Sequence, residues 1–573
     1  MAKTLDDLTT HEPGRDPGGL LTPAEPPAAP TPSHGVRKWL PLITMGLAVV
    51  IIVLDTTLLN VSLGTIVREL HTSITSLQWV ITAYSLTLAA LTIAGGRLGD
   101  LFGRKRMFVA GAVIFAAGSM LASLAASVPM LIVGESIIEG IGAALMLPAT
   151  ASLLVASYRG RDRALALGIW GGMAAAGAAI GPVLGGYLTT HYSWRWGFRI
   201  NVFVAALLVC GSLFIRDSRD REEKASIDFF GIALSSLGLL TGVFAIIEGS
   251  AYGWWSAHGN LRIFGHSVAP GGLSMVPILV AISLFLLSMF VAWEQRLTSR
   301  GGTPLVSMKL FANGQFTAGA SLTAAMSLGQ IGLTFCIPVF LQSVRGLDAL
   351  HTGYALLPLP AALLVTAPLG GYLAAHVNPK RLVQAGLFIS VVGLIFLRQA
   401  LNATTTSVDL IAPLAIYAAG LGVSMSQLGN ITMSAVSVNQ AGEASVVNNT
   451  LRQIGSSLGT AIVGSVLIAS IAGGLSGGVK SSATINPVYR AAVSREAKAQ
   501  ASAVEFGGRL ISSQPLTPAE RVEIKQISNE ATVRADRTAL IFTIVFTAIG
   551  FLLAMRLPNT RNVERNQSLA SPH

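Results

Sequence analysis

Two glutamates stand inside an apolar segment of the sequence, Leu131–Thr150, which reads LIVGESIIEGIGAALMLPAT. Glu135 and Glu139 are four residues apart, close to one turn of an α-helix, so both carboxyl groups should project from the same face. Two charges about 6 Å apart repel each other by roughly 2–3 kcal/mol at an effective dielectric constant of about 20. Such a pair favours holding one proton near neutral pH, so these residues could bind and release a proton when their exposure changes.

Most of the chain shares the apolar character of this segment, which indicates a membrane protein. Of its 573 residues, 52% are hydrophobic and 12% are charged, against about 25% charged residues in soluble domains. An acid within a membrane span is costly and is therefore a candidate functional residue. Asp55, in the segment VLDTTLLNVSLGTI (Val53–Ile66), is a third such acid, at an estimated depth similar to that of Glu135. The alternative is structural: Glu139 would hydrogen-bond a neighbouring helix, and Glu135 would reach the outer headgroups.

Several classes of protein are excluded by composition and by the motifs that the sequence lacks. A net charge of +11 could indicate a nucleic-acid partner, but the apolar segments leave no room for a basic domain. The phosphate-binding pattern Gly-x-x-x-x-Gly-Lys-Ser/Thr does not occur, and the 9 histidines have no metal-ligand spacing. No nucleophile and base emerge as a pair. We therefore expect no enzyme, no nucleic-acid partner, no metal and no cofactor.

Fourteen apolar segments have the length needed to cross a bilayer, so the sequence predicts an all-α integral membrane protein. The expected spans are roughly 40–63, 78–96, 107–126, 129–153, 164–188, 200–215, 229–249, 273–293, 315–341, 354–375, 382–400, 409–433, 453–473 and 538–555. Residues 1–36, rich in Pro, Gly and Thr, are expected to be a disordered tail. Between the last two spans, Pro487–Arg509 and 518–537 have helix-forming composition, so 474–537 is either a helical hairpin or a disordered linker.

Lysine and arginine indicate which loops face the cytoplasm. With the N-terminus inside, the short cytoplasmic segments hold 22 of these residues and the short outer loops hold 6. The excess predicts a multi-pass protein of the cytoplasmic membrane with both termini in the cytoplasm and 474–537 outside.

An internal repeat divides the spans into two sets. GGRLGDLFGRKR (Gly95–Arg106) follows the second span and GGYLAAHVNPKR (Gly370–Arg381) follows the tenth, with the glycine pair, the leucine and the terminal basic pair in register. A duplicated six-helix unit with two extra helices between the copies explains this spacing, and parallel repeats of this kind form transporters with a central site. The expected parts are a tail at 1–36, a six-helix bundle at 37–216, two linker helices at 217–310, a second bundle at 311–556 with the external loop 474–537, and a tail at 557–573.

Two motifs carry glycines at fixed spacing. The first, GRLGDLFGRKR, allows a tight turn and contains Asp100, which can cap a helix or pair with a cation. The alternative is a basic cluster that only fixes topology. In the second, GAAIGPVLGG, glycines recur every four residues from Gly177 to Gly185 and form one smooth face for close helix contact, while Pro182 permits a bend. Generic helix packing is the alternative there.

Together with the segment Val53–Ile66, these motifs resemble those of the fourteen-span drug:proton antiporters of the major facilitator superfamily, the EmrB/QacA type. The resemblance runs from about Leu40 to Pro558. It implies two six-helix bundles plus two extra helices, a cytoplasmic latch between the halves and an antiporter motif typical of exporters. The latch residues would be Gly96, Arg97, Asp100, Gly103, Arg104, Lys105 and Arg106, and the antiporter residues would be Gly177, Gly181, Pro182, Gly185 and Gly186.

The fourth span departs from the family's pattern, which reads Arg-x-x-Gln-Gly-x-Gly. Gly140 and Gly142 match, but Ser136 stands at the arginine position and Glu139 at the glutamine position. The proton-relay role of that arginine therefore cannot be transferred to this chain. We expect Asp55, Glu135 and Glu139 to provide proton coupling at the substrate cavity instead.

The resemblance implies a proton-coupled exporter of lipophilic, cationic drugs or toxic compounds. Its expected partners are small lipophilic substrates, protons and membrane lipids, and the chain is expected to be a monomer. An exporter of one endogenous lipid or secondary metabolite would use the same machinery, and the sequence does not separate the two. A non-transporting membrane sensor or scaffold is a third hypothesis, but it has no use for three embedded acids.

Overall fold

Helices make up most of the chain in a computed structural model that describes residues 38–158, 160–215, 228–255, 262–263, 266–267, 274–302, 304–374, 376–436, 441–499 and 516–557. The first group is α1 (Leu40–Glu69), α2 (Ile74–Phe102), α3 (Arg104–Ser123), α4 (Val128–Leu131), the π-helical segment η2 (Ile132–Glu139), α5 (Gly140–Ser157), α6 (Gly160–His191) and α7 (Arg195–Ser212). Next come α8 (Phe229–Tyr252), the antiparallel pair β1 (Arg262–Ile263) and β2 (His266–Ser267), and α9 (Met275–Ser299). The last group is α10 (Met308–Ala312), α11 (Gly314–Ser343), α12 (Ala349–Leu356), α13 (Pro358–Leu373), α14 (Pro379–Ala400), α15 (Ser407–Met433), α16 (Ala441–Ser481), α17 (Pro487–Ala499) and α19 (Pro518–Ala554). The expected tail at 1–36 and nearly all of the tail at 557–573 lie outside the described residues.

Every expected span coincides with one helix or with a short run of consecutive helices. Eleven helical segments among the described residues are long and apolar enough to cross a membrane. Helices α2, α6 and α7 cover the three remaining expected spans, so the full count of fourteen stays a prediction. The chain is a multi-pass α-helical membrane protein.

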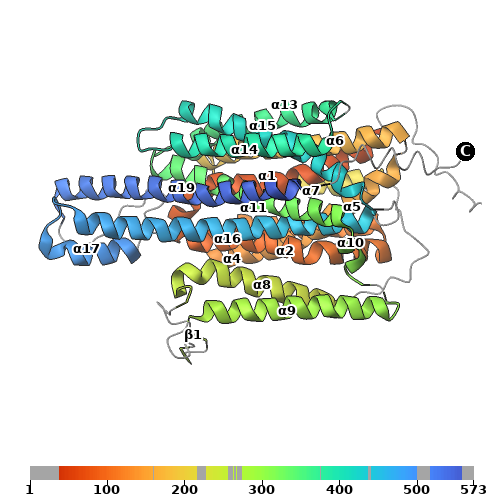
Figure 1. The fold of residues 1–573 in the computed structure, drawn as a ribbon, viewed down its shortest axis with the longest axis horizontal. Helices are drawn as coiled ribbons and strands as arrows, with labels where there is room; N and C mark the ends of the chain where they lie inside the picture. Colours follow the sequence, from red (N-terminus) through yellow and green to blue (C-terminus); the bar gives the residue numbers. More distant parts are fainter. Residues whose placement is uncertain are drawn as a thin grey trace, which may run out of the picture. The chain divides into compact units, whose positions relative to one another are not determined.

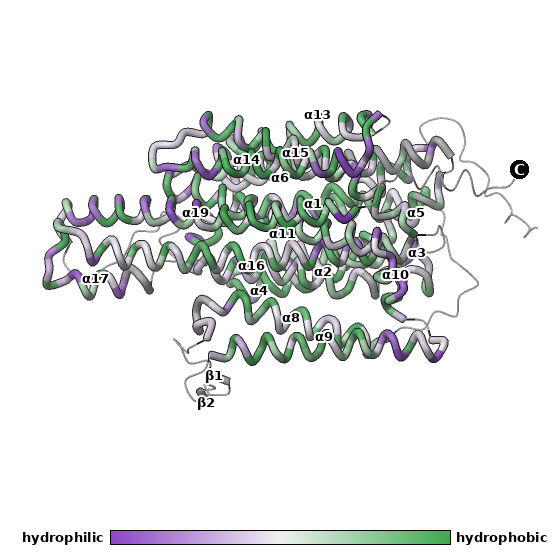
Figure 2. The backbone as a smooth tube through the Cα atoms, in the orientation of Figure 1, coloured by the Kyte–Doolittle hydropathy of each residue, from purple (hydrophilic) through white to green (hydrophobic). Residues whose placement is uncertain are grey.

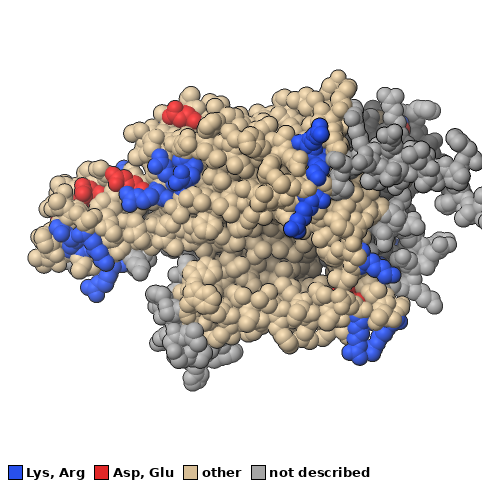
Figure 3. Space-filling view, in the orientation of Figure 1, with Lys and Arg blue, Asp and Glu red and all other residues tan. Residues whose placement is uncertain are grey.

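Apolar side chains cover the outer surfaces of these helices. Figure 2 shows hydrophobic residues along the middle of the helices and hydrophilic residues toward their ends. On the face drawn in Figure 3, the charged side chains of the described residues likewise gather toward the helix ends. Phe203 and Phe285 are 66% and 63% exposed, although contact with water is unfavourable for such side chains. Exposed apolar side chains of this kind are suited to contact with lipid.

The helices pack in two groups. In the first, α1 packs against α6 and α7, and α3 packs against α5 and α7. In the second, α13 and α14 pack against α15, and α11 and α16 pack against α19. The groups meet where α2 contacts α16 and where α6 contacts α12. Helices α8 and α9 lie side by side along one edge (Figure 1), and α8 contacts both α2 and α16, so it touches both groups.

Two long helices extend beyond the apolar part of the bundle. Helix α16 continues to Ser481, α17 follows it, and α19 begins with a capping box. In this box Glu520 N donates to the Thr517 hydroxyl at 3.3 Å, and Thr517 N donates to the Glu520 carboxylate at 2.8 Å. Residues 500–515 lie outside the described chain. The described part of 474–537 is thus largely helical, and its position outside the membrane stays a prediction.

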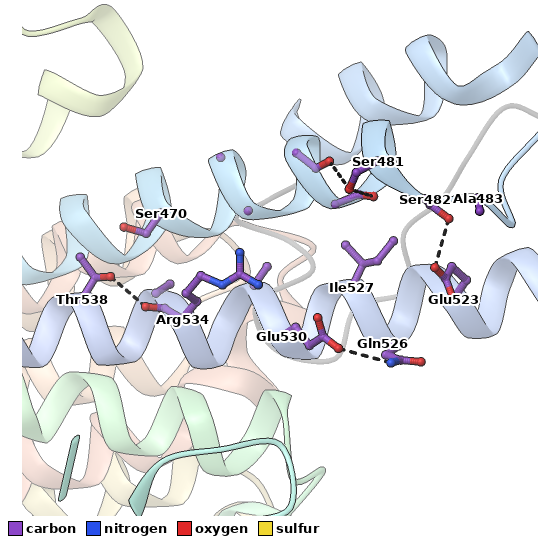
Figure 4. Close-up of a pocket in the computed structure, with 16 residues that line it drawn as sticks. Ser470, Ser481, Ser482, Ala483, Glu523, Gln526, Ile527, Glu530, Arg534 and Thr538 are labelled. Carbon is purple, nitrogen blue, oxygen red and sulfur yellow. Dashed lines mark hydrogen bonds between the residues drawn. The ribbon is translucent and has the colours of Figure 1, made fainter. Parts of the chain in front are cut away.

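A groove of about 760 Å³ lies between the extensions of α16 and α19 (Figure 4). Four glycines between Gly473 and Gly478 form part of the α16 wall, and the acids Glu523 and Glu530 are on the α19 wall. Ser482 Oγ donates to Glu523 Oε1 at 3.1 Å and ties the two helices together. Charged side chains on the wall of this groove agree with a groove that is open to water.

Candidate functional site

The three acids predicted from the sequence lie in the interior of the first helix group. Asp55 on α1 and Glu135 are each 2% exposed, and Glu139 is fully buried. Asn201 of α7 joins two of them, because its Nδ2 donates to Asp55 Oδ1 at 2.9 Å and to Glu139 Oε1 at 3.0 Å. The same nitrogen donates to Ser119 Oγ of α3 at 3.3 Å. One amide therefore connects α1, α3, η2 and α7.

Both glutamates lie on the π-helical segment η2 rather than on the regular α-helix that their spacing predicted. In a π-helix each backbone N–H bonds to the carbonyl five residues back, and such segments are frequent at functional sites. The N–H of Gly140, for example, donates to the carbonyl of Glu135. Glu135 lies within electrostatic reach of Asp55, so all three acids belong to one cluster, hereafter the carboxyl cluster.

Glycines bring α3 close enough to η2 to bury these carboxyl groups. A Cβ at Gly118 would lie 2.6 Å from the Gly134 carbonyl oxygen and would collide with the backbone nitrogen of Glu139. Ser136, which occupies the family's arginine position, secures η2 to α2, because its Oγ donates to the Val80 carbonyl at 2.7 Å. The residue that replaces the arginine therefore makes a helix contact.

Several buried atoms of the carboxyl cluster and its surroundings have no hydrogen-bond partner among the described residues. They are Asp55 Oδ2, Glu135 Oε2, Glu139 Oε2, Asn201 Oδ1 and the hydroxyl of Tyr84. Tyr84, on α2, lies within electrostatic reach of all three acids. In the described part of the chain, no lysine or arginine forms a salt bridge with them. The described residues therefore provide the three carboxyl groups with no counter-charge.

Asn201, Ser119 and Tyr84 are site residues that sequence reasoning missed. Asn201 is the one amide side chain of α7, whose sequence is RWGFRINVFVAALLVCGS. A lone amide in an apolar helix is a usable signal, because it needs a hydrogen-bond partner when it is buried. Ser119 and Tyr84 give weaker signals, because a serine can bond the backbone of its own helix and a tyrosine can lie at the membrane interface.

The predicted latch residues lie at the turn between α2 and α3 and are separate from the carboxyl cluster. Gly103 ends α2 and begins α3 with a φ of +103°, a conformation that glycine adopts readily. Arg97 Nη2 donates to the Pro304 carbonyl at 2.9 Å and ties α2 to the segment after α9. The side chain of Asp100 lies outside the described part of the chain. The remaining latch residues are Gly96, Arg104, Lys105 and Arg106, on the same two helices.

The antiporter motif packs α6 against the part of α1 that carries Asp55. Its three glycines on that face are Gly177, Gly181 and Gly185. A Cβ at Gly181 would collide with the side chain of Thr57 and would lie 3.3 Å from the Leu54 carbonyl oxygen. The absence of these Cβ atoms therefore sets the distance between α6 and the helix that holds one of the acids.

The same motif contacts the second helix group through its other face. A Cβ at Gly186 would collide with the Ala349 carbonyl of α12. A Cβ at Gly353 of α12 would lie 2.9 Å from the carbonyl carbon of Pro182. The sequence predicted one contact face for this motif, and the structure has two.

Comparisons with known proteins agree with this architecture. Residues 45–460 match the Major Facilitator Superfamily. The chain is 31% identical to the tetracenomycin C resistance and export protein of Streptomyces glaucescens, over 78% of this chain and 79% of that protein. It is 32% identical to the multidrug efflux pump LfrA of Mycolicibacterium smegmatis, over 76% of this chain and 81% of that protein.

A solved structure has a similar fold. It is the crystal structure of a bacterial homologue of the human lysosomal transporter Spinster, in an inward-facing and unoccupied conformation. The TM-score is 0.57 at 17% sequence identity, and the similarity covers 92% of this chain and 98% of that chain. The family match over most of the sequence decides the assignment: the chain belongs to the Major Facilitator Superfamily, and it is a transport protein rather than an enzyme.

Proposed function

We propose that this transporter exports small lipophilic compounds in exchange for protons, and that the carboxyl cluster of Asp55, Glu135 and Glu139 binds the coupling proton. The observation that carries the proposal is the Asn201 amide between Asp55 and Glu139, in a buried site where the described residues offer no counter-charge. Efflux as the direction of transport is supported by the export protein and the efflux pump among the relatives.

The carboxyl cluster favours bound protons while it is buried. An ionised carboxylate without a cation costs several kcal/mol in a protein interior. Two or three ionised groups in one cluster would also repel one another. Asn201 can stabilise an ionised acid by hydrogen bonding, but it has only one amide group for two acids. We therefore expect the cluster to keep at least one proton until a conformational change exposes it to water.

Exchange follows because the carboxyl cluster must be neutralised before it can be buried again. On the side with the higher proton concentration, a proton neutralises it. On the other side, a bound cationic substrate can replace the proton as the counter-charge of Asp55. The protonated transporter and the substrate-bound transporter can then change from exposure on one side of the membrane to exposure on the other, whereas the ionised transporter without substrate cannot. This difference couples the flow of protons to the flow of substrate.

Export of one endogenous lipid or secondary metabolite is the second candidate function. It is favoured by the relative that is named for resistance to tetracenomycin C and its export. The same proton site would drive either substrate. A non-transporting sensor or scaffold, which would show no substrate flux, is not favoured, because the chain belongs to a transporter family.

The arrangement in the membrane is part of the proposal. Residues 37–216 and 311–556 would form the two bundles, with 217–310 between them and 474–537 outside the cytoplasmic membrane. Both termini would lie in the cytoplasm, and the protein would work as a monomer among membrane lipids. The latch motif would hold the cytoplasmic ends of the bundles together, and the antiporter motif on α6 would favour export.

Flux in proteoliposomes tests the proposed function. We expect the wild type to move the lipophilic cation ethidium only while a pH gradient is present. Glu139→Gln should reduce this flux at least about tenfold, equivalent to about 1.4 kcal/mol, because the amide keeps the shape of the acid but cannot exchange the proton. Glu530→Gln, in the groove between the extensions, is the matched control and should transport normally. Flux that ignores the gradient would reject proton coupling, and no flux of any compound would favour the sensor.

A further inference from the structure

A fourth buried acid lies outside the carboxyl cluster, on the last helix of the second group. Asp536 of α19 is fully buried. Neither of its carboxyl oxygens has a hydrogen-bond partner among the described residues. An ionised carboxylate in this position would cost several kcal/mol. A buried acid without a partner is therefore more stable with a proton bound.

The buried neighbours of Asp536 along α19 belong to apolar clusters. Val533 and Leu540, three residues before it and four after it, belong to one hydrophobic cluster with Phe340 of α11 and Leu397 of α14. The neighbouring alanines of α19 belong to a second cluster that includes residues of α11 and α16. The acid therefore lies between two apolar clusters, at the place where α19 packs against the rest of its group.

Two arginines close in the fold to this part of α19 bind other groups. Helix α11 contains no charged residue. Helix α14 contributes Arg398, whose Nε donates to the carbonyl of Arg537 at 3.3 Å. Arg537 itself donates from Nε to the carbonyl of Leu401 at 2.7 Å. Both guanidinium groups thus bind backbone oxygens, and neither is bonded to Asp536.

The charged residues of α16 and of the rest of α19 lie elsewhere as well. Arg534 lines the groove between the two extensions (Figure 4). Lys480 is in the last turn of α16, beyond Gly474, which faces Ala531 of α19. Arg452 is near the opposite end of α16. Among the described residues, nothing on the helices that pack against α19 compensates a negative charge on Asp536.

Asp536 belongs to a polar stripe on α19. Thr543 and Thr547, seven and eleven residues further on, are buried on the same side. The Thr543 hydroxyl has no hydrogen-bond partner among the described residues. Gly332 and Gly329 of α11 face these threonines: a Cβ there would lie 3.0 Å and 2.9 Å, respectively, from a threonine hydroxyl oxygen. Along the α11–α19 interface, polar side chains of α19 therefore face glycines of α11.

We propose that Asp536 is a second proton-binding site of the transporter, which holds a proton while α11 and α19 are packed as described and releases it when their interface opens to water. This inference rests on the proton-driven export proposed above, but it places a proton-binding residue in the second helix group, whereas the carboxyl cluster lies in the first. The polar stripe gives water a path to the acid once the helices separate. The protons released per chain then include one that the carboxyl cluster does not supply.

Infrared spectroscopy of the purified protein in nanodiscs tests the bound proton without any transport. A protonated carboxyl group has a C=O stretching band that a carboxylate lacks. We expect such a band at neutral pH in the wild type and in Glu135→Gln/Glu139→Gln. In Asp536→Asn the band should be weaker, because only the contribution of the carboxyl cluster remains. Glu530→Gln, an acid on the same helix that lines the groove, is the matched control and should keep the band. An unchanged spectrum for Asp536→Asn would overturn the inference, whether or not the protein exports anything.

Proton release on addition of ethidium tests the second half of the inference. Asp536→Asn should release a proton fewer per chain than the wild type, and Asp536→Glu should restore the release and the band. If Asp536→Asn does not fold, the recovery of both signals in Asp536→Glu decides the matter. Equal release from the wild type and from Asp536→Asn would mean that the acid is only structural. A wild type that releases no proton at all would instead reject proton-driven export.

Discussion

At the scale of single residues, the chemistry of the carboxyl cluster depends on how Asn201 shares its hydrogen bonds. Its amide nitrogen has two hydrogens, and acceptors from Asp55, Glu139 and Ser119 lie within 3.3 Å of it. An ionised carboxylate attracts an N–H more strongly than a hydroxyl or a protonated acid does. Loss of a proton from either acid should therefore draw the amide toward that acid, so Asn201 stabilises the ionised form wherever it arises.

Removal of this amide should move the pH dependence of export. Hydrogen bonds to charged groups contribute about 1.5–3 kcal/mol, and about 1.4 kcal/mol corresponds to one pH unit. Asn201→Ala destabilises the ionised acids, so a higher pH is needed to remove the proton. We expect the midpoint of ethidium export against cytoplasmic pH to rise by about one to two units.

Asn60→Ala is the matched control for this prediction. The Asn60 amide, also on α1, donates to the Thr56 carbonyl of its own helix, so its loss removes no donor to the acids and the midpoint should stay within about half a unit of the wild type. A midpoint for Asn201→Ala that is unchanged, or that falls, would mean that the amide does not stabilise the ionised acids.

At the scale of helices, missing Cβ atoms decide which elements hold the acids. Gly118 lets α3 approach η2, and Gly181 lets α6 approach the turn of α1 that contains Asp55. At Gly118 the close contacts are with backbone atoms, so a larger side chain must displace a helix, whereas at Gly181 the closest contact is with the Thr57 side chain. The position of the carboxyl groups therefore depends on residues that carry no chemistry themselves.

Gly181→Ala should weaken export through packing alone, and a second substitution should restore export in part. The added methyl group collides with Thr57, whose hydroxyl bonds only to carbonyls of its own helix. Overpacking of this kind costs about 1–3 kcal/mol. We expect lower thermal stability and reduced ethidium flux for Gly181→Ala. Recovery in Gly181→Ala/Thr57→Ala should be partial, because the Cβ of residue 57 would still lie 2.9 Å from the added methyl group. Gly371→Ala, where the methyl group would meet nothing within 4 Å, should behave as the wild type does.

The positions of the helices could be predicted from the sequence more fully than their contacts. An apolar segment of bilayer length can satisfy its backbone only as a helix, so the spans follow from composition. The wider turn of η2 could not be predicted, because residues four apart share a face in either kind of helix. The second contact face of α6 depends on α12, which is far away in the sequence. For the same reason the acids could be named from their own segment, whereas Asn201 required the packing of α7.

At the scale of the whole molecule, the two helix groups are joined by contacts that a transport cycle must rearrange. Gln78 of α2 donates to the Thr460 carbonyl of α16 at 2.8 Å. The next residue, Trp79, donates to Glu248 of α8 at 2.8 Å. A change in the packing of α2 against α16 must therefore also move α8. Proton binding can drive such a change only if the protonated carboxyl cluster favours a buried conformation and the ionised cluster favours a conformation exposed to water.

The release of protons on substrate binding tests this coupling most directly. Purified protein in weakly buffered detergent solution receives ethidium, and a pH dye records the protons released by the wild type and by Glu135→Gln/Glu139→Gln. We expect the double variant to release fewer protons per chain and to lose gradient-driven flux, while its affinity for a neutral lipophilic compound stays close to that of the wild type. A double variant that releases protons and pumps as well as the wild type would contradict the proposal that these glutamates bind the coupling proton.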